Sequence, residues 1–196
     1  MKKIFLQKRL DIQVPDSVIQ SIWNLYDLSQ SSNYATYPIM IGTQYNGSMD
    51  CVVVTEFQKS ISDKTSESKI PELPKRKVWI CDNDDVKIID AFIKKHFTSA
   101  FMFRVDKMYA RTKLNWHKQH SFPKVFIPMH ETVTEFMVKI NNDESTLHSN
   151  KFELGSCWLW DVRQNHSVDN TKSDIDRFMA CFCIDPYLET NTQIFV

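Results

Sequence analysis

The sequence predicts a mainly β protein with helices in its N-terminal part, and two observations lead to this fold class. Two segments before residue 98 have apolar residues at helical spacing. From Ser99 onward, short runs rich in β-branched and aromatic residues follow one another between polar breaks. Such a series is typical of a β-sandwich, barrel or jelly roll. Helices packed outside that core would cover one of its apolar faces.

The size and composition of the chain fit one domain. A chain of 196 residues with 42% hydrophobic residues is large enough for a single apolar core. We therefore expect residues 1–196 to form one domain. In it, residues 1–98 would make a helical and mixed part that packs on a β core of residues 99–186.

The N-terminal part contains two predicted helices and one predicted strand. Residues 15–30 begin with PDS, which is typical of a helix start, and residues 83–97 begin with acidic and end with basic side chains, which suits the helix dipole. Residues 50–57, DCVVVTEF, predict a strand. The polar residues 58–76 predict a loop.

The C-terminal part contains a series of predicted strands. In chain order they are FMFRV, MYARTKL, KVFIPMH, VTEFMVKI, STLHSNKFEL, SCWLWDV, HSVDN and RFMACFCID. In SCWLWDV, alternation places Trp158 and Trp160 on one face of the strand and Leu159 on the other.

Charge, cysteine and glycine contents exclude several classes of function. Lys+Arg and Asp+Glu both number 24, so we expect neither a nucleic-acid nor a membrane partner. No apolar run is long enough to span a membrane, and the N-terminus lacks the apolar segment of a signal peptide, which predicts a cytoplasmic protein. The five cysteines form no CxxC pair, and the three glycines form no phosphate-binding loop.

Two of the six histidines and one arginine are candidate functional residues. His117 ends a predicted strand, and His166 follows a later one, so both can point into the mouth of a barrel. Imidazole nitrogens suit Fe(II), Zn(II), Cu(II) and Ni(II). Arg177 opens an otherwise apolar strand, so its charge needs an acidic or wet neighbour. An anion site and an ion pair with Asp174 or Asp176 both satisfy that need.

Together, these features resemble a known enzyme family. The order Gly155, SCWLW, Asp161, His166 and Arg177 is similar to the C-terminal signature of the aspartyl/asparaginyl β-hydroxylase-like branch of the Fe(II)/2-oxoglutarate-dependent oxygenases. The resemblance covers about residues 100–186. It implies a double-stranded β-helix core, which is a jelly-roll or cupin-like fold.

The resemblance also implies an activity and a set of site residues. His117 and His166 would be the ligands of Fe(II), and Arg177 would hold the far carboxylate of the cosubstrate 2-oxoglutarate. With O2, such a site hydroxylates a C–H bond. The substrate would be an amino-acid-like small molecule or a peptide side chain. The sequence does not indicate the oligomeric state.

The sequence departs from the family at the third metal ligand and in the strand that follows. Gln119 stands where a carboxylate is usual, and His120 is a possible substitute only if a loop carries it. Lys124 stands at the position of a family arginine, and His130 lies two residues beyond that of a family histidine. We expect Lys124 and His130 to contribute to cosubstrate binding. For Lys124, a substrate contact and an edge-strand lysine that discourages aggregation remain alternatives.

Two other functions compete with the oxygenase. The chain could be a non-catalytic, cupin-like binding module in which Gln119 marks the loss of the full metal triad. It could also be an interaction protein whose 13 Phe, five Trp and six Tyr residues form a partner surface, although aromatic side chains mostly fill cores. Arg111 and Arg163 could bind a substrate carboxylate or form structural ion pairs.

Overall fold

The computed structural model describes residues 4–30, 51–57, 77–81, 83–111, 113–117, 122–131, 135–140, 143–148 and 152–196. For 29–30, 51–57, 77–81, 113–117, 135–140 and 143–148 it describes the backbone alone. The elements are β1 (Gln7–Gln13), α1 (Asp16–Gln30), β2 (Cys51–Phe57), β3 (Lys77–Cys81), α2 (Asp84–His96), β4 (Ala100–Met108), β5 (Lys113–His117), β6 (Lys124–Pro128), β7 (Glu135–Ile140), β8 (Asp143–His148), β9 (Ser156–Trp160), β10 (His166–Asp169), β11 (Arg177–Ile184) and the short 3-10 helix η1 (Thr192–Ile194).

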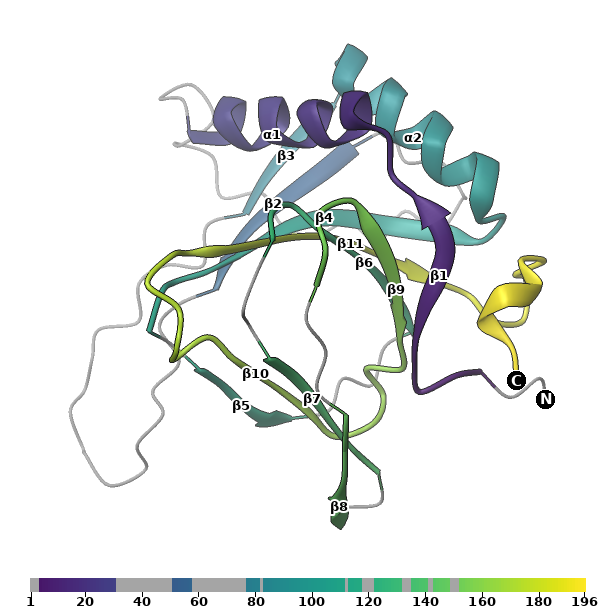
Figure 1. The fold of residues 1–196 in the computed structure, drawn as a ribbon. Helices are drawn as coiled ribbons and strands as arrows, with labels where there is room; N and C mark the ends of the chain where they lie inside the picture. Colours follow the sequence, from purple (N-terminus) through teal and green to yellow (C-terminus); the bar gives the residue numbers. More distant parts are fainter. Residues whose placement is uncertain are drawn as a thin grey trace.

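The strands form two facing sheets with the strand order of a jelly roll. The larger sheet has the order β1-β9-β6-β11-β4-β2-β3, and the smaller has the order β5-β10-β7-β8. From β4 onward the chain alternates between the two sheets, except at the β7–β8 hairpin (Figure 1). This alternation confirms the predicted fold class, a mainly β protein with N-terminal helices and a double-stranded β-helix core.

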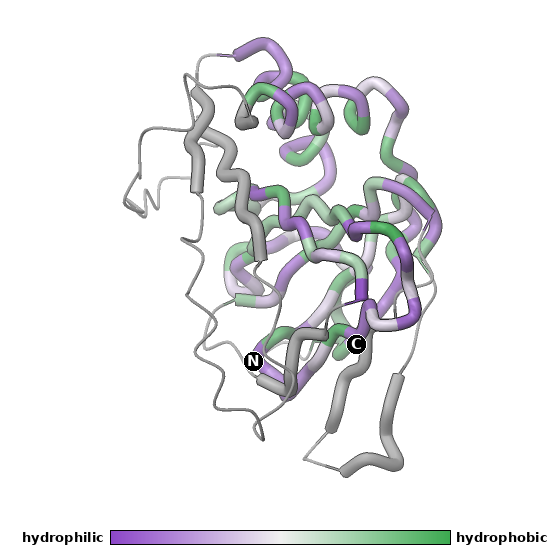
Figure 2. The backbone as a smooth tube through the Cα atoms, turned by 90° about the vertical axis from the view of Figure 1, so that its left-hand side faces the viewer, coloured by the Kyte–Doolittle hydropathy of each residue, from purple (hydrophilic) through white to green (hydrophobic). Residues whose placement is uncertain are grey.

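Both helices lie on the outer face of the larger sheet (Figure 1). Buried side chains of α1 and α2 form one apolar cluster there with residues of the larger sheet. In β11 these residues are Phe178, Ala180, Phe182 and Ile184. The alternate residues of β11 face the smaller sheet, since Met179 and Cys181 belong to a second, inner cluster. Figure 2 shows hydrophobic and hydrophilic stretches following one another along the helices and strands. Burial of each large apolar side chain contributes about 1.5–3 kcal/mol to this packing.

The inner cluster lines the larger sheet on the side that faces the smaller one. Its buried members are Met108, Phe126, Phe152, Trp158, Trp160, Val162, Val168, Met179 and Cys181. Trp158 and Trp160 face this interior, whereas Leu159 packs on the helix side, as the alternation in SCWLWDV predicts. Aromatic rings of this cluster pack closely, with 4.3 Å between the ring centroids of Trp160 and Phe126.

The N-terminal part contributes more strands than the sequence predicts. Strand β1 pairs with β9 at one edge of the larger sheet, while β2 and β3 extend its other edge beyond β4. The sequence prediction misses β1 and β3. It also treats FMFRV and MYARTKL as separate strands, whereas β4 runs through to Met108 and β5 begins at Lys113. Within the described ranges, neither helix has the length and apolar content needed to cross a bilayer.

Candidate active site in the barrel interior

The two candidate metal-binding histidines meet in the smaller sheet. Strands β5 and β10 are antiparallel neighbours, and His117 is the direct register partner of His166. His166 shares its face with Val168, which belongs to the inner cluster, so this face lies toward the barrel interior. The fold therefore brings together two residues that are far apart in the sequence.

The side chain of His166 is held in one orientation. It is 3% exposed, and its Nδ1 lies 2.9 Å from the carbonyl oxygen of Gln164. Because a carbonyl only accepts hydrogen bonds, Nδ1 carries a proton, and in the neutral imidazole the lone pair is then on Nε2. A hydrogen bond of this kind fixes the tautomer and ring orientation of metal-binding histidines.

The turn before His166 is built on Asp161. This buried carboxylate accepts hydrogen bonds from the backbone N–H of Arg163 at 3.2 Å and from its side-chain Nε at 2.6 Å. The backbone N–H of Gln164 donates to the carbonyl oxygen of Asp161 at 3.0 Å. Arg163 thus has the structural role that was the alternative to substrate binding. The same holds for Arg111, whose Nε donates to Asp174 at 2.8 Å.

Arg177, the first residue of β11, is buried without a carboxylate partner among the described residues. The residue is 5% exposed, its Nε has no hydrogen-bond acceptor in the described ranges, and its NH1 lies 3.9 Å from the sulfur of Met108. The two expected partners are engaged elsewhere: Asp174 with Arg111, and Asp176 with Lys107 at 3.2 Å. Burial lowers the pKa of Arg177 to about 10, and the nearby charge of Asp106 partly opposes that shift.

Three further charged residues face the same interior. Arg104 and Asp106 alternate with outward-facing residues on β4, and Arg104 NH2 lies 3.0 Å from Asp106 Oδ2. Lys124 lies on β6 opposite Trp160 and Cys183, and it is 3% exposed. Burial, followed by the charge of Arg104, lowers the pKa of Lys124. Among the described side chains of this face, cations therefore outnumber anions.

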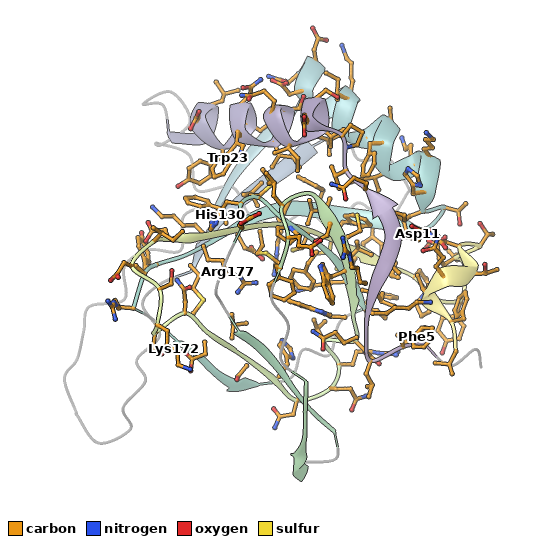
Figure 3. The ribbon with its side chains drawn as sticks, in the orientation of Figure 1. Phe5, Asp11, Trp23, His130, Lys172 and Arg177 are labelled. Atoms are coloured by element: carbon orange, nitrogen blue, oxygen red, sulfur yellow. The ribbon has the colours of Figure 1, made fainter. Side chains whose placement is uncertain are left out.

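His130 lies on the other side of the larger sheet. Strand β6 ends at Pro128, so His130 leaves the strand and packs near the ring of Phe178 on the helix side. The backbone N–H of Phe178 donates to His130 Nε2 at 3.1 Å. Figure 3 shows His130 on the side of Trp23 and Arg177 on the side of the smaller sheet. The structure does not bring His130 and Arg177 together.

Two sequence candidates lie outside the described residues, and the sequence prediction missed two charged residues of the interior. Gln119 and His120 lie outside the described residues. Within the described part of the chain, no group of three His, Cys, Asp or Glu side chains is arranged to hold a metal. The sequence prediction did not single out Arg104 or Asp106. The available signal was two opposite charges at alternate positions of an otherwise apolar run, FMFRVDKM.

Comparisons with known proteins add a likeness in strand arrangement. No protein-family model matches the chain, and no curated protein matches it. Among solved structures, the chain is similar to a non-heme monooxygenase, the ThoJ–Ni complex, at 14% identity and a TM-score of 0.36, covering 50% of this chain and 54% of that one. The chain thus spans about half the length of ThoJ.

Two other solved structures are similar at comparable distances. An oxidoreductase of the 2OG-Fe(II) oxygenase family from Burkholderia pseudomallei is 12% identical, with a TM-score of 0.42, and the match covers 61% of this chain and 66% of that one. A cupin domain from Bordetella pertussis is 18% identical, with a TM-score of 0.32, and the match covers 40% and 75%. The structural neighbours of this chain are thus non-heme oxygenases and cupins, too distant for a function to be transferred from them.

Proposed function

We propose that this protein is an Fe(II)/2-oxoglutarate-dependent oxygenase. It would hydroxylate a C–H bond of an amino-acid-like small molecule or of a peptide side chain. The observation that carries the proposal is Arg177, a buried guanidinium without a described counterion, on the inner face of the larger sheet, while His117 and His166 are register partners in the smaller sheet. An unpaired buried charge costs several kcal/mol, and a bound carboxylate would offset that cost.

The residues present fit both groups that the proposal requires. A guanidinium matches the geometry of a carboxylate and can form two parallel hydrogen bonds with it. Arg177 Nε is a donor without a described acceptor, which suits an incoming anion. Two imidazoles suit Fe(II), and the proton on His166 Nδ1 leaves Nε2 with the lone pair that a metal needs.

In the proposed reaction, each residue of the site has a separate task. His117 and His166 hold the metal, Arg177 binds and orients the far carboxylate of 2-oxoglutarate, and Lys124 supplies a second inward-facing positive charge. When bound, iron with 2-oxoglutarate and O2 supplies the oxidising chemistry. The apolar side chains of the inner cluster exclude water from the site, which protects the reaction from unproductive side reactions.

Anaerobic binding tests this proposal directly. Fe(II) with 2-oxoglutarate is expected to give the charge-transfer absorption band of the iron chelate with the wild-type protein. His166→Ala is expected to abolish the band. Arg177→Met is expected to weaken 2-oxoglutarate binding by about 30-fold or more while sparing metal binding, because loss of one partner from a buried charge pair costs about 2–5 kcal/mol.

The matched control is Arg111→Met, which removes an exposed arginine from the connection between β4 and β5 and is expected to leave 2-oxoglutarate binding unchanged. A wild-type protein without the band and without 2-oxoglutarate binding would contradict the oxygenase and leave the non-catalytic binding module. Equal behaviour of Arg177→Met and the wild type would remove Arg177 from the site.

A further inference from the structure

The carboxylate of Asp106 is used on one oxygen only. Arg104 donates from Nε and from NH2 to the same atom, Asp106 Oδ2, each at 3.0 Å. The thiol of Cys181 donates to that oxygen as well, at 3.4 Å. Three donors thus converge on Oδ2. A guanidinium that pairs with a carboxylate often bonds both of its oxygens in parallel, and here it does not.

The other oxygen, Asp106 Oδ1, is a buried acceptor without a donor in the part of the chain that the structure describes. Asp106 is 7% exposed, so this oxygen has lost most of its contact with bulk water. Buried polar atoms are nearly always hydrogen-bonded, and each exception calls for a reason. Because Arg104 and Cys181 hold Oδ2 in place, Oδ1 has a fixed direction before any ligand arrives.

Asp106 lies next to the proposed cosubstrate site. Its register partner on β11 is Met179, a member of the inner cluster, and Arg177 is two residues before Met179 on the same face. A negative charge at this position weakens the binding of an anion by Arg177. Asp106 is therefore unsuited to hold the dicarboxylate, and its Oδ1 calls for a different ligand.

We propose that Asp106 Oδ1 binds a neutral hydrogen-bond donor, an amide N–H or a hydroxyl, of the organic substrate. This inference rests on the proposed function, because it places the substrate beside a cosubstrate held by Arg177. A neutral donor fits better than an ammonium group. Arg104 already balances the charge of Asp106, and Arg177 and Lys124 add positive charge to the same face.

The variant Asp106→Asn inverts the polarity of this position while nearly preserving its shape. The donors from Arg104 and Cys181 require an oxygen acceptor, so the asparagine carbonyl takes the place of Oδ2. Its NH2 group then takes the place of Oδ1 and offers a donor where the wild type offers an acceptor. Met179→Leu is the matched control, because it changes the register partner of Asp106 without changing polarity.

The test measures binding by isothermal titration under anaerobic conditions to protein that holds Fe(II) and 2-oxoglutarate. The donor probes are N-acetyl-L-amino-acid amides and the analogues that carry a hydroxyl group in place of the acetylamino group. Each is compared with the form methylated at that N–H or O–H, and free L-amino acids are titrated as well. The wild type and Met179→Leu are expected to bind donor probes about 10-fold or more tightly than methylated ones. In Asp106→Asn this preference is expected to disappear, while 2-oxoglutarate binds as tightly as in the wild type or more so.

The outcomes separate the two proposals. If the wild type does not bind 2-oxoglutarate, the proposed function fails and takes this inference with it. If 2-oxoglutarate binds, the inference alone is overturned by any of three results: donor and methylated probes that bind equally or not at all, free amino acids preferred through their ammonium group, or an unchanged preference in a folded Asp106→Asn. The wild-type comparison needs no variant, so it decides the matter even if Asp106→Asn does not fold.

Discussion

Gly155 occupies a position where the backbone itself requires glycine. Its φ is +70°, and an added Cβ would lie 3.2 Å from the carbonyl oxygen of Val14 and 2.9 Å from Nε2 of Gln13. The same residue joins three strands: its N–H donates to the carbonyl oxygen of Pro128 at 3.1 Å, and its carbonyl accepts from the N–H of Val14 at 2.8 Å. The turn that leads into β9 thus depends on this one residue.

We expect Gly155→Ala to lower the free energy of unfolding by about 1–3 kcal/mol, because alanine pays for the positive φ and for the close backbone oxygen. Urea unfolding at neutral pH measures the change. Leu154→Ala, at a neighbouring exposed side chain, is the control and is expected to change stability by less than about 0.5 kcal/mol. Equal stability of Gly155→Ala and the wild type would show that the turn adapts.

Single residues also mark where sequence reasoning succeeds. Arg177 was singled out because a charge opened an apolar strand; the ion pair with Asp174 or Asp176 was one of two alternatives, and in the structure Arg177 is buried without either partner. His130 was placed by assuming that the strand continued past Pro128, but the chain leaves the strand there. Alternation fixes the face of a residue only within a strand. The metal and cosubstrate roles of the candidate residues stay predictions.

At the scale of elements, the segment after β11 is fastened by one carboxylate. Glu189 Oε2 accepts from the backbone N–H of Ser99 at 3.1 Å and from its hydroxyl at 2.7 Å. Oε1 accepts from the backbone N–H groups of Thr98 at 3.1 Å and of Asn191 at 2.9 Å. The end of the chain is thereby tied to the turn between α2 and β4.

This carboxylate makes stability depend on pH. Burial opposes its charge, but hydrogen bonds from Ser99, Asn191 and Thr98 outweigh burial and hold the pKa of Glu189 below its usual value of 4.5. Because the folded pKa is lower than the unfolded one, the stabilisation is present above pH 4.5 and is lost as the pH falls through the folded pKa. We expect Glu189→Gln to be less stable than the wild type at pH 7.

Urea unfolding of the wild type and Glu189→Gln between pH 7 and pH 3 measures this effect. The difference in unfolding free energy between the two proteins is expected to narrow below about pH 4.5, because protonated glutamate and glutamine then resemble each other. Glu153→Gln serves as the control, since its ion pair with Arg9 is largely exposed. A constant difference over the whole range would contradict the predicted role of the charge.

Elements differed in how well the sequence predicted them. Helix α2 was predicted from its spacing and terminal charges, and it runs from Asp84 to His96, capped by Asn83. Strand β1, QKRLDIQ, was missed because its exposed positions carry charges that hide the buried Leu10 and Ile12. Strand β3 follows a polar segment and has only five residues. Short edge strands take their structure from the neighbouring sheet, a long-range effect that local patterns do not contain.

At the scale of the molecule, the jelly roll explains why distant residues meet. The resemblance of the sequence to an oxygenase family implied this fold, and the strand order confirms the fold itself. Register was beyond sequence reasoning: the pairing of His117 with His166, and the shared face of Arg104, Asp106 and Arg177, depend on which strands become neighbours within each sheet and in what register. The sequence therefore contains the charged residues of the interior, but it does not show that they lie close to one another.

The connection between β10 and β11 is a stiff one. Asn170 Nδ2 donates to the carbonyl oxygens of Tyr109 at 3.0 Å and Ile175 at 3.2 Å. The hydroxyl of Ser173 donates to the carbonyl oxygen of Ile175 at 3.0 Å, and the N–H of Arg111 donates to the carbonyl oxygen of Ser173 at 3.1 Å. These bonds tie the end of β10, the strand of His166, to the start of β11 at Arg177, so they restrict how far the two strands can move relative to each other.

Two binding groups that are held apart in this way select a ligand by the length of its carbon chain. If His166 holds the metal and Arg177 the far carboxylate, 2-oxoglutarate is expected to bind at least about 10-fold more tightly than oxaloacetate, one carbon shorter, or 2-oxoadipate, one carbon longer. Anaerobic titration with Fe(II) compares the three acids. Equal affinities for the three acids would show that the connection between β10 and β11 does not hold the two groups at a set distance. Ser173→Ala, which loosens the connection without touching either group, is expected to lower this selectivity, so the turn between the strands would decide which oxo acid the barrel accepts.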